Sequence, residues 1–202
     1  FIFRDYRDNF LSVKKFRFEA PIIALQAYRW KYVARLAYQF EKKFPEQTLI
    51  IRYEDLTRKP REILSHTCTF LGLPYDETML DFWTYSSKYS EFVDPELLNQ
   101  FHSGLQSPIQ TSSSGKWMKE MKQKEIKTAD QVVGRYAERL GYQRVDKKFH
   151  PITWLKTLPW QLYGFILYRM MSLAEFLPAS LRQKFSMTLP KLTNIYHKWF
   201  KK

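Results

Sequence analysis

The residues best suited to chemistry lie at the start of the chain, in the run Phe1-Ile2-Phe3-Arg4-Asp5-Tyr6-Arg7-Asp8-Asn9-Phe10-Leu11-Ser12. Apolar residues give way to turn-forming and charged ones, which predicts a strand, a tight turn and then a helix. Arg4 would lie at the carboxyl end of the strand, and Ser12 in or near the first helical turn. A guanidinium and a hydroxyl placed in this way could bind a phosphate group. The structural alternative for Arg4 is a strand-end salt bridge with Asp5 or Asp8.

The elements that would position these residues alternate along the first part of the chain. Helices are expected over residues 10–18 and 22–44, where apolar residues recur at helical spacing. The run 48–53 is short, apolar and β-branched, as in a buried parallel strand. Pro60 then opens a helix that Gly72 ends near residue 71.

The later elements are separated by a long polar stretch. Asp76 is placed to cap a helix over residues 77–83, and the segment 85–114 is predicted to be a loop. Helix returns over residues 116–140, in one piece or two, and Gly141-Tyr142 closes it. This order predicts half of an α/β sandwich. Two strands do not form a stable parallel sheet alone, so we expect residues outside this chain to complete it.

Charge and aromatic residues set the end of the chain apart. Of the net charge of +13, residues 147–202 contribute +9, from ten Lys or Arg and one acid. Helices are expected there over 158–176 and 181–200, interrupted by prolines. We predict a boundary near Asp146, with a partial domain over 1–146 and a basic, aromatic-rich helical extension over 147–202.

Three interpretations of this extension stay open. It could be an interfacial helix on an anionic membrane surface, or a helical extension that packs on the preceding domain. Nucleic acid is the third and weakest interpretation, because no binding module is recognisable. No apolar run reaches the roughly 18 residues that span a bilayer. Because the sequence contains no signal peptide, we expect a cytoplasmic protein, which would be membrane-associated if the extension binds lipid. A chain that starts within a domain does not, however, show whether a targeting signal precedes it.

Metal chemistry has little support in the sequence. Cys68 is the only cysteine, which excludes an intrachain disulfide and a cysteine-based metal site. The four histidines are scattered, without the spacing of metal ligands. We therefore expect no metal cofactor.

Three segments together resemble motifs of the sulfotransferases that use 3'-phosphoadenosine 5'-phosphosulfate (PAPS). In that family an Arg-Asp-Pro-Arg-Asp-like turn binds the 3'-phosphate, with a Ser eight residues after its first Arg, as Ser12 follows Arg4 here. The matching segments are Arg4-Asp5-Tyr6-Arg7-Asp8 with Ser12, Arg52-Tyr53-Glu54-Asp55-Leu56 with Phe70-Leu71-Gly72-Leu73, and Gly115-Lys116-Trp117. The resemblance covers roughly residues 1–143.

The resemblance implies a three-layer α/β fold related to the P-loop nucleotide-binding folds, with the parallel sheet incomplete in this chain and a basic helical carboxyl-terminal extension. It also implies an enzyme, a transferase that moves a sulfuryl group from PAPS to a hydroxyl or amine of a small molecule or a glycan. Such an enzyme must align an anionic donor with the acceptor and stabilise the departing phosphate. No metal is required for this reaction.

The resemblance assigns roles to six residues. They are Arg4 and Ser12 at the 3'-phosphate, Tyr53 at the adenine, and Ser114, Gly115 and Lys116 in a loop that covers the nucleotide. Tyr53 could instead be a half-buried strand residue, and Lys116 could lie in solvent. Trp117 is expected to anchor the core, and Glu54 and Asp55 are expected to bond backbone groups.

The sequence departs from the family pattern at three places. Tyr6 replaces the usual Pro of the first motif, and Gln110-Thr111-Ser112 replaces an Arg-Lys-Gly of the covering loop. In that loop, phosphate contacts would have to come from serines, backbone N–H groups or Lys116. The 5'-phosphosulfate loop and the catalytic base precede this strand in the family and have no counterpart here. We therefore expect the carboxyl-terminal portion of an enzyme, inactive by itself.

Overall fold

The computed structural model describes residues 1–15, 20–85 and 107–181. The predictions for residues 16–18, for the loop over 86–106 and for nearly all of the second tail helix lie outside these ranges. The elements are β1 (Ile2–Phe3), α1 (Tyr6–Lys15), α2 (Ile23–Lys43), η1 (Pro45–Gln47), β2 (Ile51–Arg52), α3 (Tyr53–Arg58), α4 (Pro60–Leu71), η2 (Glu77–Tyr85), η4 (Thr111–Ser113), α7 (Trp117–Glu120), α8 (Gln123–Val133), α9 (Tyr136–Arg139) and α10 (Pro151–Ala174).

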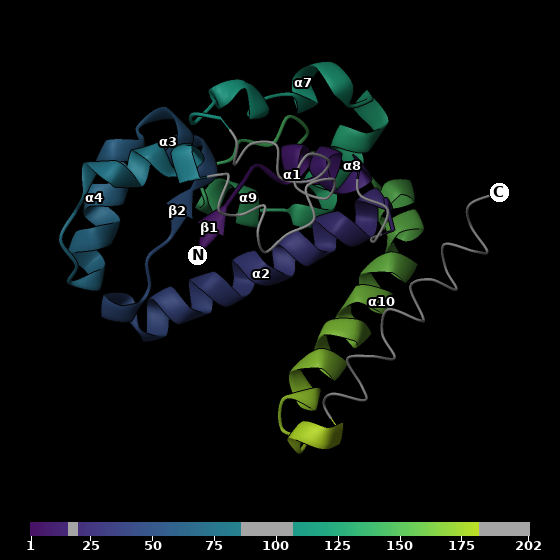
Figure 1. Ribbon diagram of the computed structural model, residues 1–202. Helices are drawn as coiled ribbons and strands as arrows, with labels where there is room; N and C mark the ends of the chain where they lie inside the picture. Colours follow the sequence, from purple (N-terminus) through teal and green to yellow (C-terminus); the bar gives the residue numbers. More distant parts are fainter. Residues whose placement is uncertain (16–19, 86–106, 182–202) are drawn as a thin grey trace. The chain divides into compact units, whose positions relative to one another are not determined.

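The two strands lie side by side and run parallel, as the sequence predicted (Figure 1). Ile2 pairs with Ile51, and Phe3 pairs with Arg52. The second strand is shorter than the predicted run 48–53, because β1 offers only two residues to pair with. Its residues are half-buried rather than buried.

The register of this strand pair sets the position of the candidate site. The residues that follow the paired ones, Arg4 after β1 and Tyr53 after β2, leave the sheet at the same edge. Tyr53 was predicted as the last residue of a strand, but the structure makes it the first residue of α3. The carboxyl edge of a parallel sheet is where α/β proteins bind their ligands.

Helix α1 begins earlier than the sequence predicted. The Asp5 carboxylate accepts the backbone N–H of Arg7 at 2.9 Å, the bond by which an N-cap residue stabilises a helix start. The helix therefore starts at Tyr6 instead of near Phe10. Ser12 lies in its second turn, and the expectation of a position in or near the first turn was wrong.

Helix α4 follows its local signals closely. Pro60 occupies its first turn, where the missing N–H of proline leaves no bond unmade. Gly72 ends the helix in the left-handed conformation at φ +68°. Asp76 accepts the N–H of Thr78 at 2.8 Å, as expected of a cap, although the segment that follows, η2, is a 3₁₀ helix.

The segment predicted as helix over 116–140 consists of three helices. Gly134 has a φ of +61° and separates α8 from α9. The carboxylate of Glu125 accepts the N–H of Lys122 at 2.9 Å, which caps α8 and separates it from α7. Gly141 closes the segment at φ +79°.

The contacts divide the chain into two compact units, Phe1–Asp8 with Leu36–Lys119 and Asn9–Arg35 with Glu120–Lys202. The division falls within α1 and within α2. The first unit contains the strand pair. The second contains α8 to α10, and its core includes Trp30 packed edge-on against Tyr142 at 6.0 Å between ring centroids. The predicted boundary near Asp146 remains a prediction.

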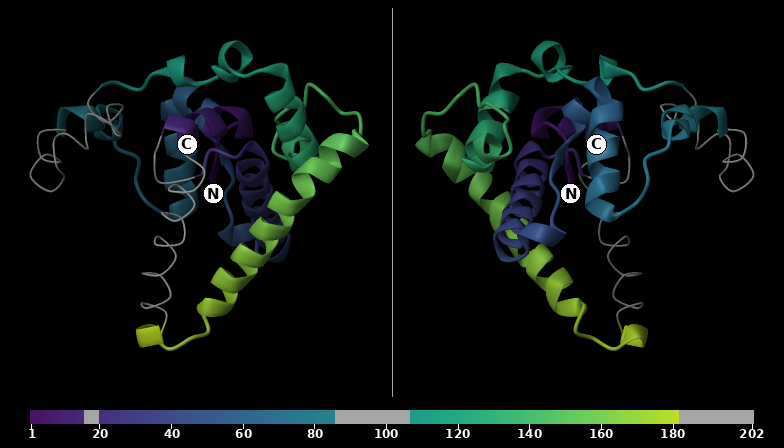
Figure 2. Two further views of the ribbon diagram at one scale, coloured as in Figure 1. Left: turned by 90° about the vertical axis from the view of Figure 1, so that its right-hand side faces the viewer. Right: turned by 90° about the vertical axis from the view of Figure 1, so that its left-hand side faces the viewer.

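Helix α10 starts earlier than the predicted 158–176 and continues past Pro159 as one long helix (Figure 2). It packs against α8, and its Tyr168 stacks on Tyr32 at 4.9 Å between ring centroids. Gly164 allows the close approach, because a Cβ there would lie 2.6 Å from the ring of Tyr28. In the described ranges, no helix has both the length and the apolar character to cross a membrane.

Candidate nucleotide site

Three segments meet at the carboxyl edge of the strand pair, all within the first unit. The Nη2 atom of Arg4 donates to the carbonyl oxygen of Ser113 at 2.5 Å, although 109 residues separate the two in the chain. The Arg4 guanidinium also lies over the ring of Tyr53, at 5.2 Å from its centroid. The structure therefore brings Arg4, Tyr53 and the start of the covering loop together, as a shared nucleotide site requires. Asp5 pairs with Arg7, and the alternative of a strand-end salt bridge of Arg4 with Asp5 or Asp8 remains a prediction.

Residues 111–116, which the resemblance implies to be the covering loop, contain a buried hydroxyl and a glycine at positive φ. The Oγ atom of Ser114 is buried and has no hydrogen-bond partner in the described part of the chain. Gly115 has a φ of +78°, and a Cβ there would lie 2.9 Å from the Cε atom of Met118, so a glycine fits best. Lys116 is half-buried. The binding roles of these residues remain predictions.

Ser12 lies on α1, in the part of that helix that belongs to the second unit. Its assignment to the 3'-phosphate also remains a prediction. The N–H of Arg7, near the start of the same helix, is bound to Asp5. This N–H group at the helix start therefore already has a hydrogen-bond acceptor within the protein.

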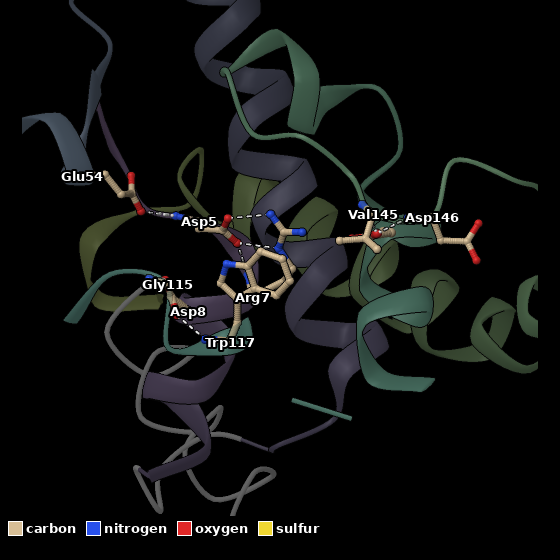
Figure 3. Close-up of polar contacts among 9 residues, drawn as sticks. Asp5, Arg7, Asp8, Glu54, Gly115, Trp117, Val145 and Asp146 are labelled. Carbon is tan, nitrogen blue, oxygen red and sulfur yellow. Dashed lines mark hydrogen bonds and ion pairs between the residues drawn. The ribbon is translucent and has the colours of Figure 1, made fainter. Parts of the chain in front are cut away.

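The most buried polar group of the site is one that the sequence did not single out as functional. The side chain of Asp8 accepts the N–H of Gly115 at 2.6 Å with one carboxylate oxygen and the N–H of Trp117 at 2.9 Å with the other (Figure 3). Asp8 is only 1% exposed. Burial raises the pKa of its carboxyl group, and the two backbone bonds only partly oppose this effect.

A second set of contacts surrounds Arg7, whose side chain is buried. Its guanidinium lies 3.6 Å from the centroid of the Trp117 ring and binds Asp5 through two bonds, at 2.9 and 2.7 Å (Figure 3). The N–H of Asp5 donates in turn to the carboxylate of Glu54 at 2.9 Å. The expectation that Glu54 bonds a backbone group is confirmed. Trp117, expected to anchor the core, is half-buried and packs on Arg7.

The sequence contained a signal for these contacts. Two acids and two arginines alternate over Arg4-Asp5-Tyr6-Arg7-Asp8, immediately after a strand. Such alternation in a turn indicates internal pairing. It does not show which carboxylate pairs with which partner.

The parallel strand pair, its helices and the sheet edge at which three segments meet are compatible with an α/β fold. The family model of the sulfotransferase domain matches residues 2–147, and the chain belongs to this family. Neither the curated proteins nor the solved structures include a significant match to it. Among the described residues, no group of three His, Cys, Asp or Glu side chains is arranged to hold a metal ion.

Proposed function

We propose that this chain carries the 3'-phosphate and adenine side of a PAPS site, in an enzyme that transfers a sulfuryl group to a hydroxyl or amine. The acceptor would be a small molecule, and a carbohydrate is included in this proposal. The observation that carries the proposal is the contact of Arg4 with both Tyr53 and Ser113, which joins the three motif segments at one sheet edge.

The residues at this edge suit the nucleotide. A guanidinium binds phosphate oxygens through several parallel donors, and its charge complements the dianion. The tyrosine ring can stack on a purine base. The buried Ser114 hydroxyl has hydrogen-bonding capacity to spare, which a phosphate oxygen could use. When bound, PAPS supplies the activated sulfuryl group, and this chain's residues would hold and orient the nucleotide.

The transferring half of the reaction is proposed to lie in residues outside this chain. The sequence contains no strand–loop–helix with the glycines and lysine of a phosphosulfate loop. In β1, the side chain of Ile2 is 62% exposed, which supports an interaction with further structure. We expect the chain of 202 residues to bind the nucleotide and to transfer no sulfate by itself.

Calorimetry with the product nucleotide 3',5'-ADP tests this proposal directly. We expect saturable one-to-one binding that is at least about tenfold stronger than binding of 5'-AMP, because only 3',5'-ADP carries the 3'-phosphate. Equal affinities for the two nucleotides, or no binding of either, would contradict the assignment. Transfer of sulfate from PAPS by this chain alone would contradict the proposal that the transferring half of the site lies in other residues.

We also propose that α10 and the residues after it contact an anionic membrane surface. Outside its packed stripe, the helix exposes large apolar side chains: Ile152, Trp154, Leu155, Leu158, Leu162, Tyr163, Phe165, Ile166, Met170, Met171 and Leu173. Residues 147–202 carry a charge of +9. Exposed apolar area together with positive charge is the combination that binds helices to anionic bilayers.

Flotation of the chain with lipid vesicles tests this second proposal. We expect binding to vesicles that contain phosphatidylserine and little binding to pure phosphatidylcholine. The attraction of the positive charge to anionic lipid adds to the free energy gained by burying apolar side chains in the bilayer. Replacing Ile152, Leu155 and Leu162 with glutamine should abolish binding. The matched control replaces two exposed leucines of the first unit, Leu71 and Leu73, and should bind as the parent does. Equal binding of both variants would refute the role of α10.

A further inference from the structure

We propose that Asp8 is the positioning residue of the covering loop. Its ionised carboxylate would hold the backbone of Gly115 and Trp117, so that the Ser113 carbonyl stays on Arg4 and the loop can close on the nucleotide. This inference rests on the proposed function, which places the 3'-phosphate at Arg4. Asp8 would act through the loop and would not itself touch the nucleotide.

The Asp8 carboxylate connects two points of the loop backbone. Each of its two oxygens binds a different backbone N–H, at 2.6 and 2.9 Å, across more than a hundred residues of chain. Hydrogen bonds to a charged acceptor are among the strongest in proteins. Two of them, on residues 115 and 117, fix both the position and the direction of the loop backbone. Gly115 supplies the positive φ that this path requires.

A contact next to Asp8 also joins the turn after β1 to Trp117. Arg7, one residue before Asp8, packs its guanidinium on the Trp117 ring at 3.6 Å. Asp5 orients that guanidinium through two hydrogen bonds. The end of the loop is therefore held through its backbone by Asp8 and through its side chain by Arg7.

The composition of the loop also favours such an anchor. Residues 111–116, Thr-Ser-Ser-Ser-Gly-Lys, contain one cation, Lys116, at their end. Phosphate contacts along the rest of the loop would come from hydroxyls and backbone N–H groups, whose directions depend on the course of the backbone. A loop that binds through its backbone needs an anchor, and Asp8 is the buried side chain bonded to that backbone.

The test compares two matched substitutions in the full chain, Asp8→Asn and Asp130→Asn. Asp130 lies on α8 in the second unit, is fully buried, and accepts the N–H groups of Val145 and Asp146 at 2.8 Å. Both changes replace a buried acceptor of two backbone donors with an amide. Only the first touches the covering loop.

We expect Asp8→Asn to weaken 3',5'-ADP binding by roughly tenfold or more, as for the loss of a charge-assisted hydrogen bond. Asp130→Asn should stay within about twofold of the parent at a comparable loss of thermal stability, because it leaves the loop unchanged. Asp8→Glu, which keeps the charge, should recover part of the affinity. Parent-like affinity of Asp8→Asn, or an equal loss in both Asn variants, would overturn the proposal.

A measurement on the parent chain covers the case in which Asp8→Asn does not fold. Amide hydrogen exchange should show the N–H groups of Gly115 and Trp117 protected like helical amides, since Asp8 binds both. Fast exchange at these two residues would overturn the proposal. If the parent binds no 3',5'-ADP, the proposed function fails, while the exchange result still decides whether Asp8 anchors the loop.

Discussion

Replacing Arg4 with alanine is expected to weaken the binding of 3',5'-ADP by about 2–3 kcal/mol, roughly 30- to 150-fold. The guanidinium would supply charge-assisted bonds to the 3'-phosphate, and water would replace them only partly. The change also removes the bond to Ser113 and the contact with Tyr53, so the covering loop loses a partner. Isothermal titration calorimetry measures the effect.

The preference for 3',5'-ADP over 5'-AMP distinguishes the loss of a 3'-phosphate contact from a general loss of nucleotide affinity. If Arg4 binds the 3'-phosphate, Arg4→Ala should lose most of its preference for 3',5'-ADP over 5'-AMP. The control is Arg61→Ala, which removes the same charge from the same unit; its side chain is 71% exposed and pairs with Glu77 on the surface. That variant should bind as the parent does. A full preference retained by Arg4→Ala would exclude Arg4 from the 3'-phosphate.

Arg7→Met is expected to lower the free energy of unfolding by about 3–5 kcal/mol, as for other buried ion pairs that lose one partner. Arg7 and Asp5 are 2% and 7% exposed, so the substitution leaves a buried carboxylate without its guanidinium. The Trp117 ring also loses the group packed on its face. Urea denaturation followed by circular dichroism gives the size of the change.

A double-substitution cycle tests the cause of that loss. Asp5→Asn together with Arg7→Met removes both charges, and we expect the pair to lose clearly less stability than the sum of the single changes. Arg61→Met, at an exposed pair, should cost at most about 1 kcal/mol. The effects of the substitutions at residues 5 and 7 on the free energy of unfolding could instead be additive, or Arg7→Met could cost no more than Arg61→Met. Either result would show that the buried Asp5–Arg7 pair does not cause the loss of stability.

Local elements were predictable wherever neighbouring residues decide the conformation. Apolar periodicity predicted a helix over 22–44, and the structure has α2 at Ile23–Lys43. Pro60 and Gly72 correctly marked the two ends of α4. The missing N–H of proline and the positive φ that glycine readily adopts both act within one helical turn. The parallel direction of the two strands also followed from their order along the chain.

The errors have two causes, a distant strand partner and local caps that the patterns did not reveal. Tyr53 appeared to end a strand, but β1 pairs with only two residues of β2, and the chain enters α3 directly. The segment after Lys116 appeared to be one or two helices, and Gly134 with the cap at Lys122 divides it into three. Strand length depends on the partner strand, and no pattern within one segment contains that information.

The residue pattern was sufficient to predict the motif residues, their order and the parallel strand pair that places Arg4 and Tyr53 at one edge. It did not predict the partners of the charged residues in the Arg4–Asp8 turn, which the fold sets. Arg4 reaches Ser113, Arg7 binds Asp5, and Asp8 receives the loop amides. Ser113 and Trp117 each lie 109 residues from their partners Arg4 and Asp8, so these contacts depend on burial and on three-dimensional approach rather than on spacing along the chain.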